Sequence, residues 1–553
     1  MTDLTVERHE AAPAVVGPRP TPRPERRVAP RAGVTGFGSL PAVAALVAVG
    51  GLLVWTRVIL LGEPLWQDEA YGAWAYVREG PSEILFGTYG IDNHMLYELL
   101  TWVITGIAGE SEVMYRLAAV VPAVGSALWL SVWAWRRIGP WAGVAFALFV
   151  ALHPLHLDLA RQARGYGLTY LAMAGMIVFG DAYLRKGERR DIALFAGSAA
   201  VGVLTFPFFL LTAVFAGAVM LADRRRWRTV LVTFAVTAGI VGALLANAIP
   251  QLLRSADDFQ NHTRLAPVGW KENVLWPLRQ LGPTFAFAVE RFPELRVRIW
   301  PRTDWETLVT AVVGYPLLAG GLVSLLRRRE WRFTALLLVP TVGTYLVVTL
   351  RQMGLWERYV SYLLYPTLLL VLLGGRALVV AARRNSQARL ALVAGAGLFL
   401  YPLLRLVAGP VGGAGLAVAL ALAAAVAIVP AARIAFSHHH SALGAALVVA
   451  MALAAVPSVG QLVDTSLRLD EPPRENSRAV AALITDPDST TVATTRLDGS
   501  TLFYLGLPDY SLVETARWKV GRYGDRVDFV SAAQLPYFLC SAEGDVVFVD
   551  NSA

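Results

Sequence analysis

The run LPAVAALVAVGGLLVWTRVILL, residues 40–61, is long enough and apolar enough to cross a membrane as one helix. Shortly after it comes Leu65-Trp66-Gln67-Asp68-Glu69-Ala70-Tyr71, which places two adjacent carboxylates close to the end of this predicted span. Ionisable residues are costly so near a bilayer and are commonly functional. Asp68 and Glu69 are therefore the first candidate site in the chain.

The composition extends the membrane interpretation to most of the chain. Hydrophobic residues make up 56% of the 553 residues and charged residues 16%, and the mean hydropathy is +0.51. These values exclude an ordinary soluble domain. Apolar stretches of about 17 to 25 residues recur, and we expect about thirteen spanning helices. The predicted fold class is an all-α polytopic integral membrane protein with a small C-terminal extracytoplasmic α/β domain.

Basic clusters orient the predicted spans. They follow alternate spans, at Arg136-Arg137, Arg185-Lys186 with Arg189-Arg190, Arg224 to Arg228, Arg327 to Arg329, and Arg383-Arg384 with Arg389. The positive-inside rule places them in the cytoplasm of a cell whose plasma membrane the chain crosses several times. Residues 1–36, rich in Pro and Arg, are expected to form a disordered basic cytoplasmic tail that can contact membrane lipids. The net charge of +8 then reflects topology, and we expect no nucleic-acid partner.

The predicted transmembrane domain covers residues 37–460. Its first extracytoplasmic loop, 62–112, carries two amphipathic stretches, Ala70 to Val77 and Met95 to Ile107, suited to the membrane interface. A tight external hairpin follows at 153–166, and a large outer loop at 251–306. The Ala- and Gly-rich run 388–460 indicates helix packing through small residues.

Residues 461–553 differ from the rest, because their hydrophobic runs shorten to strand length. Two such runs are Thr491 to Thr495 and Asp545 to Asp550. We expect a small extracytoplasmic α/β domain here. The single cysteine, Cys540, excludes an intrachain disulfide and a multi-cysteine zinc site.

Carboxylates and arginines on the outer face suggest a reaction class. A carboxylate near the interface can act as a general base or can bind a hard divalent cation. Arginines at the level of the headgroups suit a phosphate, because the guanidinium fork meets two phosphate oxygens at once. Together they suggest group transfer from a lipid phosphate, in which the base takes a proton from an acceptor hydroxyl and arginines stabilise the departing phosphate.

The order of several short motifs resembles the C-type (GT-C) glycosyltransferases over roughly residues 40–380. More narrowly, it is similar to the bacterial branch related to protein O-mannosyltransferases and to the aminoarabinose and dolichyl-phosphate-mannose-type enzymes. The motifs are Asp68-Glu69-Ala70-Tyr71, Asn93-His94-Met95-Leu96-Tyr97, Tyr115-Arg116-Leu117, and Arg161-Gln162-Ala163-Arg164-Gly165-Tyr166-Gly167-Leu168. Members of that family are polytopic, use polyprenyl-phosphate sugars and have their active site on the outer face.

The resemblance implies a role for individual residues. Asp68 matches the family's catalytic base, with Glu69 as its neighbour. Arg164 with Tyr166, and Arg358 with Tyr359, resemble its Arg-x-Tyr and Arg-Tyr pairs, which are candidates to bind the donor phosphate together with Arg161.

The same resemblance places other residues around the site. His94 falls where relatives have His-Pro-Pro-Leu-Tyr, although both prolines are absent here, and Asn93 and Tyr97 would shape the site with it. Relatives carry Gln-Glu-Ala-Arg where this chain has Arg161-Gln162-Ala163-Arg164, so one acidic metal ligand is missing. No cofactor is certain, and a divalent cation, Mg²⁺ or Mn²⁺, held by Asp68, Glu69 and His94 stays open.

The function we expect is that of an inverting membrane glycosyltransferase. It would move a hexosyl or pentosyl group from a polyprenyl-phosphate donor to a cell-envelope glycan, lipid or protein on the outer face. The alternative is a transporter or flippase for a lipid-linked or anionic substrate, which would use the same charges to pass a headgroup. Each residue also has a structural reading: a solvated acid, an arginine reaching the headgroups, or an interfacial histidine.

Overall fold

The computed structural model describes residues 40–89, 93–223, 226–253, 315–350 and 357–382, and three strands between residues 491 and 549. The predicted tail 1–36, nearly all of the outer loop 251–306 and the small-residue run 388–460 lie outside the described residues.

The described helices are named here in their order along the chain. They are α1 Leu40–Val58, α2 Gln67–Gly72, the π-helix η2 Ala73–Arg78, α3 Pro81–Phe86, α4 Met95–Ala108, α5 Glu112–Arg137, α6 Pro140–Leu152, α7 Pro154–Arg161, α8 Tyr166–Lys186, α9 Arg189–Thr205, α10 Phe209–Leu221, α11 Trp227–Leu244, α16 Tyr315–Arg327, α17 Trp331–Leu350, the 3₁₀-helix η6 Glu357–Leu363, and α18 Leu364–Ala382.

Five described helices are long and apolar enough to cross a membrane. They are α1, α5, α8, α11 and the stretch Arg358–Val380, and a sixth is added if Pro140–Ala151 and Leu155–Arg161, bent by 68° at their junction, form one span. The chain is therefore a multi-pass membrane protein. The expected number of about thirteen spans stays a prediction, because much of the apolar sequence lies outside the described residues.

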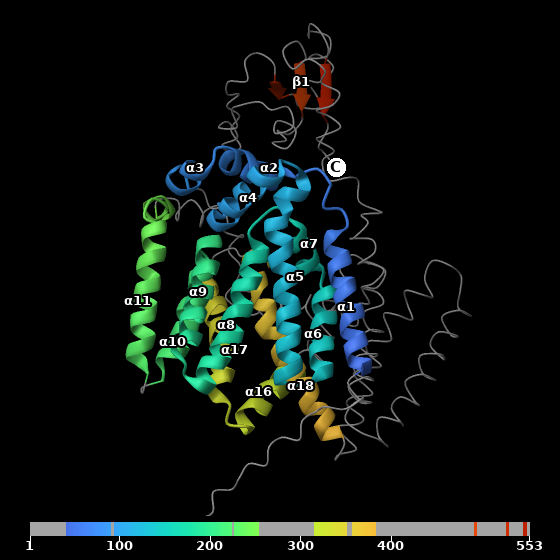
Figure 1. Cartoon of the computed structure of the whole chain (residues 1–553), viewed down its shortest axis with the longest axis vertical. Helices are drawn as coiled ribbons and strands as arrows, with labels where there is room; N and C mark the ends of the chain where they lie inside the picture. Colours follow the sequence, from blue (N-terminus) through green and yellow to red (C-terminus); the bar gives the residue numbers. More distant parts are fainter. Residues whose placement is uncertain are drawn as a thin grey trace, which may run out of the picture. The chain divides into compact units, whose positions relative to one another are not determined.

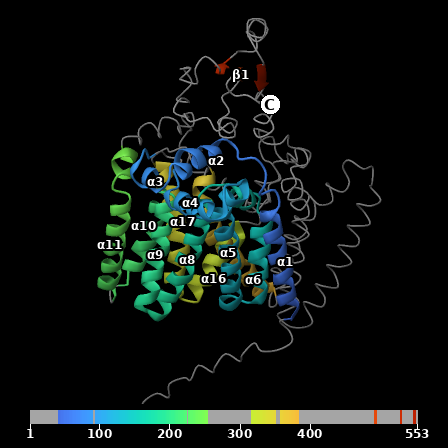
Figure 2. The ribbon, with the colours of Figure 1, turned by 45° about the horizontal axis from the view of Figure 1, so that its top comes forward.

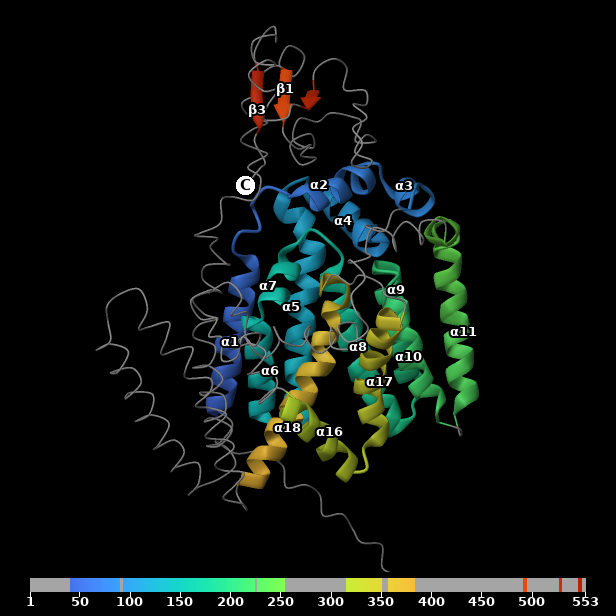
Figure 3. The same cartoon turned by 180° about the vertical axis from the view of Figure 1, so that it is seen from behind.

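The long helices run side by side, while α2, α3 and α4 lie across one end of the bundle (Figures 1, 2 and 3). The two amphipathic stretches predicted in the first outer loop are thus confirmed as helices, α2 with η2 and α4. The α5 helix begins beside them, where the Ser111 hydroxyl accepts a hydrogen bond of 3.3 Å from the Met114 N–H. Ser at this position satisfies one of the unpaired N–H groups that begin every helix.

The basic clusters that the structure describes lie at the opposite end of the bundle. The α5 helix has 26 residues, so its last turn, with Arg136 and Arg137, lies about 37 Å from its first. Arg137 pairs there with Glu330, at the start of α17, and with Asp181 of α8. Arg332 pairs with Asp223 at 3.1 Å in the same layer of loops. Several predicted clusters therefore share one face, and the cytoplasmic location that the positive-inside rule assigns to this face stays a prediction.

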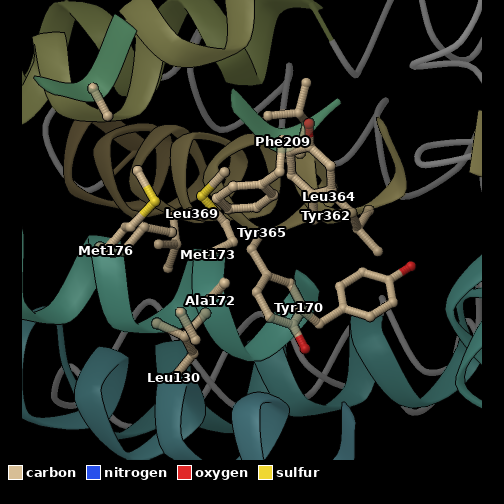
Figure 4. Packing of buried hydrophobic residues seen from close by; sticks show 14 of the residues in the cluster. Leu130, Tyr170, Ala172, Met173, Met176, Phe209, Tyr362, Leu364, Tyr365 and Leu369 are labelled. Atoms are coloured by element: carbon tan, nitrogen blue, oxygen red, sulfur yellow. The ribbon is translucent and has the colours of Figure 1, made fainter. Parts of the chain in front are cut away.

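The core of the bundle is aromatic and closely packed (Figure 4). The rings of Tyr170 in α8 and Tyr365 in α18 lie 5.2 Å apart, and those of Phe209 and Tyr362 lie 4.6 Å apart. Glycine allows α8 to approach α5, because a Cβ at Gly167 would lie 1.8 Å from the Ala119 carbonyl oxygen. Small residues at helix contacts are the usual means of close packing in membranes.

Three described strands form a parallel sheet with the order β2-β1-β3. They are β1 Thr491–Thr494, β2 Val527–Phe529 and β3 Val546–Val549, and Val492 of β1 lies opposite Val527 and Val547. The strands predicted at Thr491 to Thr495 and Asp545 to Asp550 are confirmed. The rest of the predicted α/β domain lies outside the described residues, and the domain stays a prediction.

Candidate functional site

Asp68 lies between two arginines that are distant in the sequence. It sits in the first turn of α2, and its Oδ2 atom accepts hydrogen bonds from Nη1 of Arg164 and, at 3.2 Å, from Nη1 of Arg358. The Arg164 side chain is 3% exposed, whereas those of Arg358 and Asp68 are each 26% exposed. The site is therefore closed on the Arg164 side and reached from the Arg358 side. The three residues that the resemblance made most important are brought together.

The positions of Asp68, Arg164 and Arg358 in the fold explain why their side chains lie close together. Arg164 precedes α8, Arg358 lies in η6 just before α18, and α2 lies across the same end of the bundle (Figure 3). Gly165 allows the close approach, because a Cβ there would meet Thr205 Cγ2 at 2.4 Å and His94 Nδ1 at 3.0 Å. A larger residue at position 165 would push these groups apart.

Glu69 has a different environment from its neighbour. Its carboxylate is 1% exposed and accepts two hydrogen bonds from Arg116, at 2.6 Å from Nη2 and 3.3 Å from Nε. It also accepts the Ala163 N–H at 2.5 Å and the Trp66 N–H at 3.1 Å. A carboxylate with four donors is fixed in place. Glu69 ties α2 to α5 and to the segment that carries Arg164.

His94 positions Arg164 through a defined tautomer. Its Nδ1 atom lies 3.1 Å from the Thr205 carbonyl oxygen, which only accepts, so Nδ1 carries the proton. Its Nε2 atom then accepts a hydrogen bond of 3.3 Å from Nε of Arg164. His94 is 2% exposed and lies behind the arginine, and its site-shaping role stays a prediction.

Aromatic rings support both arginines. The Arg164 guanidinium carbon lies 5.7 Å from the centre of the Tyr166 ring, and that of Arg358 lies 5.5 Å from the Tyr359 ring. These distances permit cation–π attraction. Phe206 links the two sides, since its ring lies 5.6 Å from His94 and 5.4 Å from Tyr359.

Three other predicted residues lie near this centre but do not bond to Asp68 in any contact found among the described residues. Arg161 is buried and lines a small pocket that also includes Glu69. Tyr97 is buried and donates a 2.7 Å hydrogen bond to the Tyr115 carbonyl oxygen, between α4 and α5. Asn93 is 1% exposed. Within the described part of the chain neither atom of its amide has a hydrogen-bond partner.

The sequence reasoning missed the roles of Arg116 and Glu98. Arg116, besides holding Glu69, donates to the carbonyl oxygens of Leu61 and Glu63 at 2.8 and 2.6 Å. The sequence did contain an indication of the role of Arg116, because a charged residue in the first turns of a spanning helix needs a partner. Glu98 of α4 is fully buried and accepts the His94 N–H at 2.8 Å. Burial raises the pKa of Glu98 to about 8.

The donor set fits a divalent cation poorly. Among the described residues no group of three or more His, Cys, Asp or Glu side chains is arranged to hold a metal ion. Asp68 faces two guanidinium groups and Glu69 faces a third, which would repel a cation.

The site suits an anion instead. Asp68 and Glu69 are matched against Arg116, Arg164 and Arg358, so these five side chains leave one positive charge in excess. The partly exposed guanidinium of Arg358 lies on the open side. Arginines in such a setting bind phosphate through paired charged hydrogen bonds.

Comparison with known proteins gives the fold. No family model matches the chain, and no curated protein matches its sequence. The apo crystal structure of ArnT from Cupriavidus metallidurans matches with a TM-score of 0.51 and 16% identity, over 84% of both chains. The same protein bound to undecaprenyl phosphate matches with a TM-score of 0.50 and 16% identity, over 84% of this chain and 85% of that one. The chain therefore has the fold of these ArnT structures, in agreement with the resemblance of its motifs.

Proposed function

We propose that this protein is an inverting membrane glycosyltransferase that moves a sugar from a polyprenyl phosphate to a hydroxyl group of a cell-envelope acceptor. The observation that carries the proposal is Asp68 held between Arg164 and Arg358, on the face of the bundle opposite the basic clusters. The similar ArnT structure that binds undecaprenyl phosphate supports a lipid phosphate as the donor's anchor. The positive-inside rule assigns the basic clusters to the cytoplasm, which supports a reaction on the outer face.

The reaction would proceed as one displacement. The acceptor oxygen attacks the anomeric carbon of the donor while the bond between that carbon and the phosphate oxygen breaks. Asp68 takes the proton of the acceptor hydroxyl, and the polyprenyl phosphate leaves with the electron pair of the broken bond. Because attack and departure occur on opposite faces, the configuration at the anomeric carbon inverts.

The arginines would exchange partners when the donor binds. In the protein alone, Arg164 and Arg358 both donate to the same oxygen of Asp68. The phosphate of the donor is a diester with one negative charge and two free oxygens, so it can replace the Asp68 carboxylate as the acceptor of these hydrogen bonds, and it gains a third free oxygen and further negative charge when the sugar departs. Their transfer to the phosphate leaves the Asp68 carboxylate free to accept a proton, and it stabilises the charge that develops on the leaving group.

The remaining residues of the site would hold Asp68 and the two arginines in position. Glu69 and Arg116 fix α2 and the segment before α8, and neither needs to touch a substrate. His94 holds Arg164 from behind through its Nε2 atom. Tyr166 and Tyr359 lie against the guanidinium groups and limit their freedom to turn.

Binding of undecaprenyl phosphate by the purified protein in lipid nanodiscs tests the anion site. Arg358→Met should weaken binding about tenfold to a hundredfold, because it removes a charged hydrogen bond to the phosphate. Arg78→Met is the matched control, since Arg78 is exposed and pairs with Glu110 at 2.8 Å. Equal binding by wild type and Arg358→Met would remove Arg358 from the donor site.

The transporter alternative has one observation in its favour. The pair α6 and α7 is discontinuous, with a bend of 68°, and broken helices are common in transporters. The fully buried Arg57 lies beside this break and donates to the carbonyl oxygens of Val150 and Ala151, both at 2.6 Å. Passage of a lipid-linked sugar across sealed vesicles without any transfer product would support this alternative.

A further inference from the structure

A second network of polar side chains, outside the Asp68 site, is buried between the helices. It consists of Arg57 in α1, His156 in α7, Tyr365 in α18 and Ser126 in α5, and each of these residues is 0% exposed. The reaction proposed above uses none of them. A buried polar network in a membrane protein is costly unless its members satisfy one another, so its contacts indicate what it does.

Arg57 caps the C-terminal end of α6. Its Nη1 atom donates to the Ala151 carbonyl oxygen and its Nη2 atom to that of Val150, both at 2.6 Å. The last four carbonyl groups of a helix have no partner within the helix, and a cation is favourable there. The chain bends by 68° directly after these residues, between Pro140–Ala151 and Leu155–Arg161. Arg57 therefore satisfies carbonyl groups that this break leaves open.

Hydrogen bonds continue from Arg57 in one direction. A guanidinium group only donates, so the His156 Nδ1 atom, 3.1 Å from Nη2 of Arg57, accepts, and the proton of the neutral ring lies on Nε2. That Nε2 atom lies 3.2 Å from the Tyr365 hydroxyl and donates to it. The Ser126 hydroxyl donates to the Ala123 carbonyl oxygen at 2.9 Å, so it accepts from Tyr365 at 2.8 Å. Each of these side chains therefore fixes the orientation of the next one.

The network reaches both segments that carry the arginines of the site. His156 lies in α7, and Arg164 follows three residues after that helix ends. Tyr365 is the second residue of α18 and lies seven residues after Arg358. The ring of Tyr170 packs between them in the core (Figure 4), with its centre 4.4 Å from that of the His156 ring and 5.2 Å from that of the Tyr365 ring. The two segments are thus joined to the same part of the core.

Arg57 has no acidic partner among the described residues. Its guanidinium donates to two carbonyl groups, to the His156 ring and, at 2.6 Å, to the Thr56 hydroxyl, and all of these acceptors are neutral. A buried charge without a counter-ion costs free energy, and an apolar side chain in its place is often as stable. A contribution to stability alone therefore does not explain an arginine here. Its several donors, in a fixed fork, bond to α6 and to α7 at once across the bend.

We propose that Arg57 is a positioning residue of the transferase site. Through His156 it holds α7 and so places Arg164. Through Tyr365 it holds the start of α18 and so places Arg358. Both guanidinium groups then face the same oxygen of the proposed base. The inference rests on the proposed function, because it treats these two arginines as the donor site, and Arg57 itself touches no substrate.

Two substitutions interrupt the network at different points. Arg57→Met removes the donors that cap α6, and Tyr365→Phe removes only the hydroxyl that joins the network to α18. Tyr362→Phe is the matched control for Tyr365→Phe, because Tyr362 is also buried but its hydroxyl bonds to Thr212 of α10 at 3.1 Å. Arg78→Met, which removes an exposed arginine, is the control for Arg57→Met. Thermal unfolding checks that each variant folds, and Tyr365→Phe alone suffices if Arg57→Met does not.

Cryo-EM structures of these proteins in nanodiscs, without any substrate, test the positioning itself. In Arg57→Met we expect the Arg164 guanidinium to shift relative to α5 by about 1 Å or more, a displacement large enough to impair catalysis. In Tyr365→Phe we expect a shift of the same size in the Arg358 guanidinium. Both controls should match the wild type. Unshifted guanidinium groups in both network variants would overturn the proposal.

Binding of undecaprenyl phosphate supplies a readout that a general loss of stability would not give. Tyr365→Phe should weaken binding at least about threefold in the wild-type background and should have no effect in the Arg358→Met background, because the group that it positions is then absent. Tyr362→Phe should change binding in neither background. Equal weakening by Tyr365→Phe in both backgrounds would contradict a positioning role. No binding by the wild type would refute the donor site proposed above, whereas the structures would still decide the role of Arg57.

Discussion

Substitution of Glu69 by glutamine tests whether this residue positions the site or acts in the reaction. Its two oxygens accept four hydrogen bonds, from the Arg116 Nε and Nη2 atoms and from the N–H groups of Ala163 and Trp66. In Glu69→Gln one oxygen becomes an NH₂ group that faces two donors, so two of the four bonds are lost. A bond to a charged group contributes about 1.5–3 kcal/mol.

We therefore expect Glu69→Gln to lower the free energy of unfolding by about 3–5 kcal/mol, the range found when a buried ion pair is broken. Equilibrium unfolding in mixed detergent, followed by tryptophan fluorescence, measures this change. Glu79→Gln is the control, because Glu79 is exposed and should change the free energy by less than about 0.5 kcal/mol. A Glu69→Gln variant as stable as the wild type but inactive would refute the reasoning, since Glu69 would then act on the substrate.

Three further predictions concern the same region. Gly165→Ala should cut donor consumption at least about tenfold, because the added Cβ would lie 2.4 Å from Thr205 and 3.0 Å from the His94 ring and so displace Arg164; wild-type activity would contradict this. Burial raises the pKa of Glu98 from 4.5 to about 8, so the folded protein holds this proton more tightly than the unfolded chain and stability should fall as the pH rises through that window. In Glu98→Gln the free energy of unfolding should depend less on pH, by up to about 1.4 kcal/mol per pH unit. Equilibrium unfolding at pH 5, 6, 7 and 8 measures this dependence, and the same dependence in the variant and the wild type would contradict a raised pKa for Glu98. Chelation of divalent cations with EDTA should leave donor consumption unchanged, because guanidinium groups already bind Asp68 and Glu69; loss of activity that Mg²⁺ or Mn²⁺ restores would reverse this assignment.

The sequence was sufficient for the class of fold and for the grouping of Asp68, Arg164 and Arg358, whose roles stay predictions. Apolar runs with basic flanks predict spans and their polarity, because the bilayer leaves few alternatives. Asp68, Arg164 and Arg358 could be named because charges near a membrane need partners, and the order of the motifs suggested which charges belong together.

The different contacts of the Asp68 and Glu69 carboxylates could not be predicted from the sequence. The two carboxylates are adjacent and chemically alike, and only the packing of α5 and the segment before α8 gives Arg116 and the Ala163 N–H to Glu69. The same is true of Phe206 and the Thr205 carbonyl group, which reach His94 from the end of α9. Such contacts depend on how distant helices meet, and no local pattern records them.

The most direct test of the central claim is donor turnover by purified protein in nanodiscs, with a panel of radiolabelled polyprenyl-phosphate sugars. We compare wild type, Asp68→Asn and the control Glu79→Gln, and we measure binding of undecaprenyl phosphate in parallel. The account predicts that Asp68→Asn still binds undecaprenyl phosphate but consumes donor at least about a hundredfold more slowly, the usual effect of losing a general base. Donor consumption by a well-folded Asp68→Asn variant at the wild-type rate would contradict it.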